Sequence, residues 1–116
     1  MYTLSSWTCR QESGDAKDRF IAAWQWDDNN LRHLAERHPE LARRPRRIVR
    51  QVWENEPRYR ANKAGRTAAY QMIGPDDGGF MWTFCIVEVF TDPGLWRVIT
   101  GWAAEQPEIQ WYRRQR

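Results

Sequence analysis

The longest near-continuous apolar run of the chain lies between residues 80 and 90 and predicts its central β-strand. Gly78 and Gly79 precede the run and a turn at 92–94 follows it, while β-branched and aromatic residues fill it, which favours a strand over a helix. Apolar side chains alternate onto both faces, so we expect an inner strand that is covered on each side. One face carries Phe80, Trp82, Phe84, Ile86 and Phe90, and the other carries Met81, Cys85, Val87 and Val89. Glu88 interrupts the run, and a buried carboxylate costs free energy unless it is paired.

Helical periodicity marks two segments before this strand. A short first strand over 20–26 leads to Asp27 or Asp28, either of which can cap a helix that runs through His38. Pro39 limits that helix, and a second helix is predicted to start near Pro45 and to end near Asn55. The apolar stripe of the first helix comprises Leu31, Leu34, Ala35 and His38, and that of the second comprises Ile48, Val49, Val52 and Trp53.

The remaining segments predict strands joined by short turns. In chain order they are an edge strand over 58–61, a turn over 62–65, a strand over 66–73, a loop over 74–79, the central strand, a last strand over 95–102 and a terminal helix over 105–114. The order β-α-α-β-β-β-β-α indicates an α+β fold in which two helices pack on one face of a three- or four-stranded antiparallel meander. We expect the other face to be the working surface, covered in its turn by the terminal helix or by a partner.

A chain of 116 residues suits one domain with a single core, which we assign to 19–116, with 1–18 as a loosely ordered extension. No apolar run approaches the roughly 20 residues of a membrane span. The N-terminal residues lack the basic and then apolar pattern of a signal peptide, and two cysteines do not make a disulfide framework. These observations predict a cytoplasmic protein.

The net charge of +3 is modest, but the cations are unevenly distributed. Arginines concentrate in and after the second predicted helix, and their planar, bidentate donors suit phosphate or an acidic protein partner. A solvated helix face is the alternative interpretation. The residues assigned to a nucleic-acid backbone patch are Arg43, Arg44, Arg46, Arg47, Arg50, Arg58, Arg60 and Lys63.

Short motifs over about residues 20–113 occur in the order that is found in one known family. They are Trp26-Asp27, Asn30 and Arg37-His38 at the start, then Arg66 and Ile73-Gly74, then Trp96-Arg97-Val98-Ile99-Thr100, and finally Glu108 and Tyr112. Together they resemble the BrnT family, whose members are toxins of type II toxin–antitoxin pairs with a RelE-like fold. The resemblance implies a RelE-like domain that is held by a cognate antitoxin.

Two positions depart from the family pattern. The arginine after the last strand of family members falls on Trp102 here, and the arginine that commonly follows the final-helix acid falls on Ile109. Those arginines would be natural candidates for RNA contact or catalysis. Their replacement therefore bears on ribonuclease activity more than on the fold.

RNA cleavage of the kind that the resemblance implies needs no metal, because the 2′-OH attacks the adjacent phosphate. Arginine suits the developing phosphoryl charge, and histidine or a carboxylate suits proton transfer. Two histidines, no close cysteine pair and scattered carboxylates offer no metal-ligand set, and no cofactor is expected. The catalytic candidates are Arg37, His38, Arg66, Glu88 and Arg97.

Four of the five catalytic candidates also have a structural interpretation. Arg97 can be an edge-strand arginine paired to an acid, and Glu88 can be the acid that bridges to it. His38 lies on an apolar stripe, so it can be a partly buried imidazole at a helix end. Arg66 can be a surface residue at a strand start.

The predicted function is that of a metal-independent ribonuclease toxin, neutralised by an antitoxin that covers its basic face and that can form an oligomer with it. The alternative is a catalytically silent BrnT-like module that binds nucleic acid or an antitoxin-type protein. A third interpretation is a structural module whose tryptophans form an obligate interface.

Overall fold

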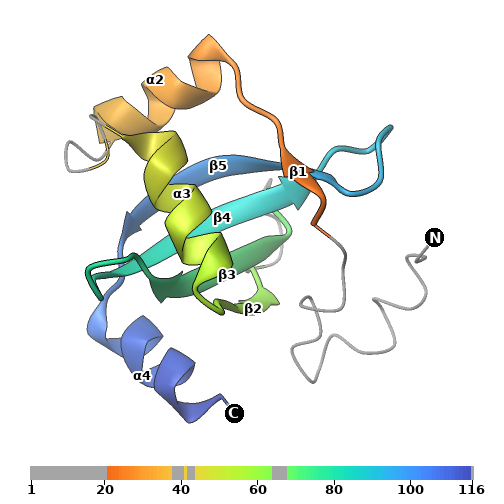
Figure 1. Cartoon of the computed structure of the whole chain (residues 1–116). Helices are drawn as coiled ribbons and strands as arrows, with labels where there is room; N and C mark the ends of the chain where they lie inside the picture. The colour runs from red at the N-terminus through yellow and green to blue at the C-terminus, as the bar shows by residue number, and fades with distance from the viewer. Residues whose placement is uncertain (1–20, 38–40, 42–43, 64–67, 116) are drawn as a thin grey trace.

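The computed structural model describes residues 21–37, 41, 44–63 and 68–115, which form three helices and one five-stranded sheet (Figure 1). In chain order the elements are β1 (Ala23–Trp24), α2 (Asp28–Arg37), α3 (Pro45–Glu54), β2 (Arg58–Ala61), β3 (Tyr70–Pro75), β4 (Met81–Glu88), β5 (Leu95–Ala103) and α4 (Gln106–Arg114). The order confirms the predicted succession of elements and the α+β class. The predicted extension over 1–18 lies outside the described residues.

The sheet has the strand order β1-β5-β4-β3-β2. Strands β2 to β5 form the predicted antiparallel meander. β1 adds to the free edge of β5 in parallel, with Ala23 opposite Leu95 and Trp24 opposite Trp96. The predicted first strand over 20–26 is thus shortened to two residues, because the chain leaves the sheet to begin α2. β3 also starts later than predicted, at Tyr70, and Arg66 lies outside the described residues.

β4 is the inner strand that the apolar run predicts, bonded to β3 on one side and to β5 on the other. Trp82, Phe84 and Ile86 are buried on one face of the sheet, which we call the core face. Phe80 and Phe90 were expected to share that burial. They lie beyond the ends of β4 and are 53% and 96% exposed, because the strand stops at Met81 and Glu88.

α3 covers the core face. Its predicted bounds are confirmed, with Pro45 in the first turn, and Val49 and Val52 fully buried. Figure 1 shows α3 crossing in front of the sheet. Its arginines point away from the sheet, as the sequence pattern predicts, and Trp53 packs edge-on against Trp24 at 5.8 Å between ring centroids.

α2 does not pack on the same face as α3, and that prediction is wrong. Asp27 caps the helix as predicted, since its Oδ1 accepts the N–H of Asn30 at 2.8 Å. The helix then lies along β5, beyond the short β1 (Figure 1). The Asn30 side-chain amide donates to the Val98 carbonyl there. This bond satisfies a strand-edge carbonyl that β1 is too short to reach. Leu34 of the same helix is fully buried in the core beside α3, so both contacts hold α2 at the edge of the sheet.

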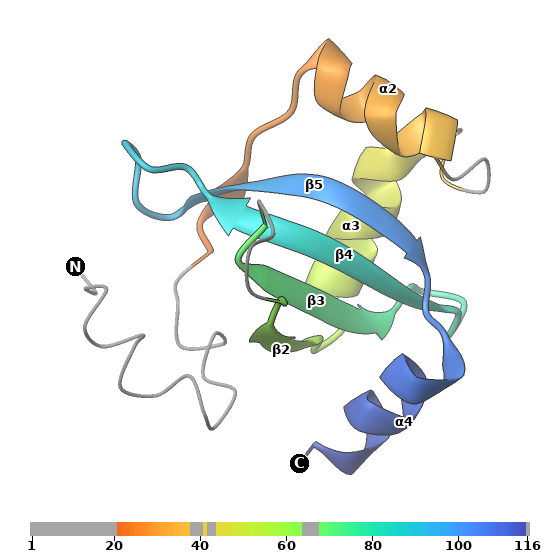
Figure 2. The same ribbon diagram turned by 180° about the vertical axis from the view of Figure 1, so that it is seen from behind.

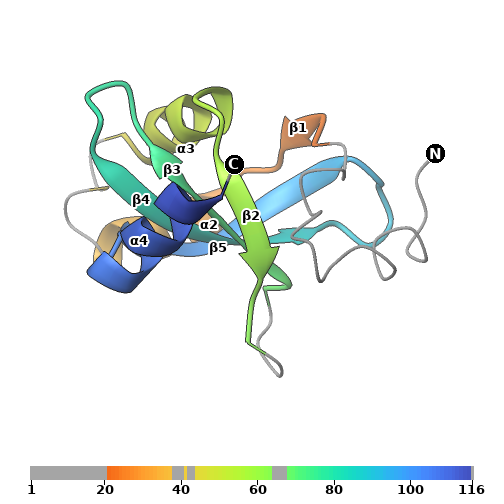
Figure 3. The same cartoon turned by 90° about the horizontal axis from the view of Figure 1, so that it is seen from below.

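The face of the sheet opposite α3 is here called the outer face, and Figure 2 shows it from behind. Figure 3 shows β2 projecting to the side away from α3. The outer face is hollowed between residues of β2, β3, β4 and β5. α4 closes one end of this face. It begins at Glu105 in a capping box with Glu108, and it has Pro107 in its first turn, as predicted.

Candidate nucleic-acid groove

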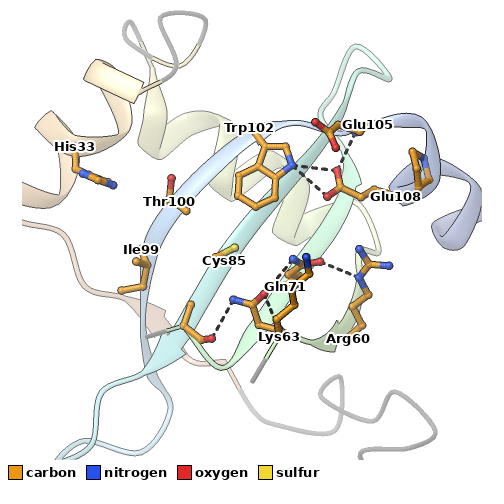
Figure 4. Close-up of a pocket in the computed structure, with 13 residues that line it drawn as sticks. His33, Arg60, Lys63, Gln71, Cys85, Ile99, Thr100, Trp102, Glu105 and Glu108 are labelled. Atoms are coloured by element: carbon orange, nitrogen blue, oxygen red, sulfur yellow. Dashed lines mark hydrogen bonds between the residues drawn. The ribbon is translucent and has the colours of Figure 1, made fainter. Parts of the chain in front are cut away.

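The concave outer face holds a groove of about 640 Å³ that runs from α2 across the sheet to α4 (Figure 4). β2, β3, β4 and β5 form its floor and one wall. The lining residues are His33, Arg60, Asn62, Lys63, Ala68, Gln71, Cys85, Ile99, Thr100, Trp102, Glu105, Pro107 and Glu108. The expectation that this face would be fully covered is only partly met, since α4 covers one end of it.

The floor owes its shape to a β-bulge. The pairing of β4 with β5 shifts between Cys85 and Ile86, so that Cys85 lies opposite Thr100 and Ile86 opposite Val98. The extra residue, Ile99, therefore lines the groove together with Thr100. The Thr100 hydroxyl is buried and has no hydrogen-bond partner among the described residues.

At the α4 end, a buried carboxylate ties the helix to the sheet. Glu108 is 8% exposed, and one of its oxygens accepts the Thr83 hydroxyl at 2.9 Å and the Glu105 N–H at 2.8 Å. The Trp102 indole N–H donates to both Glu108 oxygens, at 3.1 and 3.2 Å. The Glu108 carboxylate accepts all of these hydrogen bonds, and the bonds from Thr83 and Trp102 anchor α4 to the sheet.

The opposite wall is built from β2 and β3. Arg60 donates through Nε to Gln71 Oε1 at 2.8 Å, and its guanidinium lies 5.0 Å from the centroid of the Trp111 ring on α4. Gln71 donates in turn to Asn62 at 3.2 Å. Lys63 adds an exposed ammonium next to this chain of amides. Arg60 and Lys63 make this wall cationic, and the contacts with Gln71 and Trp111 hold the Arg60 guanidinium in position.

At the α2 end, a smaller cleft of about 230 Å³ adjoins the groove and shares His33 and Ile99 with it. Arg97 lines the cleft, and its Nη1 donates to Gln25 at 2.7 Å and to Asp27 at 2.9 Å. The Asn30 N–H and the Arg97 guanidinium hold the pKa of Asp27 below its usual range. The His33 imidazole and the Arg97 guanidinium therefore line the same cleft.

The predicted catalytic residues do not form one cluster. Arg97 lies at the groove, whereas Glu88 lies across the sheet from it, because Glu88 pairs with Trp96 and Arg97 pairs with Val87. The predicted bridge between Glu88 and Arg97 is therefore wrong. One Glu88 oxygen accepts the Gly94 N–H at 2.8 Å and closes the turn after β4. The side chain of Arg37, together with His38 and Arg66, lies outside the described residues.

The predicted nucleic-acid patch is divided by the sheet. Arg44, Arg46, Arg47 and Arg50 are exposed on or next to α3, on the core-face side, and Arg50 pairs with Glu54 at 3.3 Å. Arg58, Arg60 and Lys63 belong to β2 and the residues after it, on the groove side. Arg58 lies over the Tyr112 ring at 5.7 Å. Arg43 lies outside the described residues.

His33, Gln71 and Thr100 line the groove and were not predicted as site residues. Helical spacing held a signal for His33, since it follows the inward-facing Asn30 by three positions and so shares its face of α2. Gln71 and Thr100 lie opposite one another only through β4, and the sequence between them does not show that pairing.

Among the described residues, no cluster of histidine, cysteine or carboxylate side chains could hold a metal ion. No helix in the described part of the chain is long and apolar enough to cross a membrane. Comparison of the chain with protein-family models, curated proteins and solved structures found no match.

Proposed function

We propose that this protein binds RNA in the outer groove and acts there as a metal-independent ribonuclease of the toxin type. One observation carries the proposal: an imidazole, His33, and a guanidinium, Arg97, line one cleft that adjoins a groove flanked by Arg60 and Lys63. Cations along a groove suit the phosphates of a nucleic acid, and the imidazole suits proton transfer near neutral pH. The resemblance to BrnT toxins with a RelE-like fold points to the same class.

In this proposal His33 takes the catalytic part that the sequence assigned to His38 and Glu88. The imidazole accepts the proton of the ribose 2′-OH, whose oxygen attacks the adjacent phosphorus. The bond to the 5′ oxygen breaks, leaving a 2′,3′-cyclic phosphate and a 5′-OH that takes its proton from solvent in the open groove. Arg97 stabilises the added phosphoryl charge, because its own charge persists at every working pH.

A catalytically silent module that binds nucleic acid or an antitoxin-type protein is the second candidate. It is favoured by the engagement of Arg97 with Gln25 and Asp27, since a guanidinium held by a carboxylate must exchange that partner for phosphate. Glu88, on the far side of the sheet, supplies no second proton-transfer group to the groove.

The proposal includes an antitoxin partner. The exposed arginines of α3 face away from the groove and form a separate cationic surface. An antitoxin with acidic residues fits that surface and can reach the groove around the sheet edge, forming an oligomer with the toxin. Because the proposed substrate is RNA, we propose that the protein acts in the cytoplasm.

The test is cleavage of a labelled RNA by the purified protein in EDTA, with growth of expressing cells measured in parallel. We expect cleavage and growth arrest, and we expect both to be lost in His33→Ala and Arg97→Ala. Arg32→Ala is the matched control, because Arg32 is exposed on the same helix and does not line the groove. Intact RNA and normal growth with the unaltered protein would reject the ribonuclease and leave the binding module.

A further inference from the structure

Trp102 is the one large aromatic side chain among the described residues that line the groove, and its ring is held by a hydrogen-bond network rather than by packing alone. Its N–H is bonded to Glu108, and the same carboxylate is fixed by the Thr83 hydroxyl and the Glu105 N–H. A ring held in this way loses little conformational entropy when a ligand stacks on it. Figure 4 shows the indole broad side on, beside the floor residues of the groove.

The surroundings of Trp102 fit a flat, unpaired ring whose phosphates lie along the facing wall. Cys85 and Ile99 give the adjoining floor an apolar part. Arg60 and Lys63 stand on the facing wall of the groove (Figure 4). Aromatic platforms next to cations are the general means by which proteins bind single-stranded nucleic acid.

We infer that Trp102 is a stacking platform for an unpaired base, so that the groove takes single-stranded RNA in preference to a duplex. This inference rests on the proposed function, of which it names the substrate class. A base inside a duplex has both faces covered by its neighbours and cannot stack on the indole.

The amides of the groove indicate that base identity is read weakly. Gln71 Oε1 accepts from Arg60, Gln71 Nε2 donates to Asn62, and Asn62 Nδ2 donates to the Ala68 carbonyl at 3.1 Å. Because these groups already bond to one another, little of their hydrogen-bonding capacity is directed at a base edge. Stacking accepts any base, so we expect a small difference in affinity between pyrimidine and mixed sequences.

The experiment measures binding rather than cleavage, with three probes of equal strand length: a 12-nucleotide uridine strand, an abasic strand with the same phosphates, and a 12-base-pair RNA duplex. We expect the uridine strand to bind about tenfold or more tightly than the abasic strand, and the duplex to bind no better than the abasic strand. Trp102→Ala should remove the difference between the uridine and abasic strands. Trp102→Phe, which keeps a ring and loses the bond to Glu108, should retain most of it.

Phe90→Ala is the matched control, because Phe90 is an exposed aromatic that does not line the groove, and it should change none of the affinities. Thermal melting of each variant shows whether α4 stays in place. Equal binding of the uridine and abasic strands would overturn the stacking platform and leave RNA binding intact. An equal loss in Trp102→Phe and Trp102→Ala, with both folded, would also overturn it. Failure of all three probes to bind would reject the proposed function itself.

Discussion

Arg97 Nη1 lies 2.9 Å from Asp27 Oδ2, and this ion pair joins β5, near the edge of the sheet, to the residue that caps α2. Asp27 uses its other oxygen for the Asn30 N–H, so a single carboxylate holds both a helix start and a cation of the cleft beside the groove. The two roles of Asp27, capping α2 and pairing with Arg97, can be separated by mutation. An asparagine can still cap a helix but cannot pair with arginine as an anion.

We expect Asp27→Asn to lower the melting temperature less than Asp27→Ala does, since the first variant loses the ion pair alone and the second also loses the cap. The folded protein holds the pKa of Asp27 below its ordinary value of 3.8, so the ionised carboxylate favours folding. That contribution is complete above about pH 4 and is lost as pH falls through the lower pKa of the folded state. Melting curves from pH 7 to pH 2 measure it.

Asp27→Asn also tests the role of Arg97 in the proposed RNA site. Asp27→Asn should leave Arg97 with Gln25 as its partner, so the guanidinium exchanges more readily for phosphate. RNA affinity is expected to rise in Asp27→Asn at neutral pH. If the melting-temperature difference between the wild type and Asp27→Asn stayed constant down to pH 2, the ion pair would not be the cause of the difference.

Glu108 anchors α4, and its removal should cost more stability than any exposed change on that helix. Glu108→Ala removes the acceptor of the Trp102 indole N–H and of the Thr83 hydroxyl, and the hydroxyl is buried. We expect a loss of about 2–4 kcal/mol in the free energy of unfolding, measured with urea. Gln110→Ala, at an exposed position of the same helix, is the control and should stay within about 0.5 kcal/mol of the wild type. Similar losses in the two variants would show that the carboxylate is not an anchor.

Gly101 lies opposite Phe84 on the core face, and a Cβ at position 101 would lie 2.3 Å from Phe84 Cδ1. Gly101→Ala is therefore expected to destabilise the fold by about 1–3 kcal/mol through overpacking. Phe84→Leu in the Gly101→Ala background should recover part of this loss, because it removes the ring that clashes. Gly78→Ala is the control, since its Cβ would meet only Asp76 Oδ1 at 3.5 Å. Urea denaturation of Gly101→Ala, Phe84→Leu, the double variant and Gly78→Ala measures the coupling, and strictly additive effects of the two core changes would contradict the clash.

The predictions from local patterns succeeded where the pattern itself determines the structure. α3 and α4 begin and end within about a residue of their predicted bounds, because proline, apolar spacing and caps act over a few positions. The position of α2 depends on the bond from Asn30 to Val98, 68 residues away, and no local pattern contains it.

The predicted ion pair between Glu88 and Arg97 was wrong for a different reason. The register of β4 against β5 places Val87 opposite Arg97, and a shift of one residue would have placed Glu88 there on the same face. Composition cannot distinguish the two registers, since both keep the strand apolar. The groove could not be predicted for the same reason. Gln71, Cys85 and Thr100 lie side by side only in the register that is observed.

The two cationic surfaces, on α3 and along the groove, make opposite predictions for the salt dependence of RNA binding. Each surface supplies a pair of cations for a matched comparison: Arg46 and Arg47 on α3, and Arg60 and Lys63 at the groove. Each contact with a phosphate of single-stranded RNA contributes about 0.7 to the slope of log K against log salt. If the RNA lies in the groove, replacement of Arg60 and Lys63 by alanine should lower that slope by about 1.4. Replacement of Arg46 and Arg47 removes the same charge and should leave it unchanged. A lower slope in the α3 variant alone would move the RNA to the core-face side and reject the groove as its site.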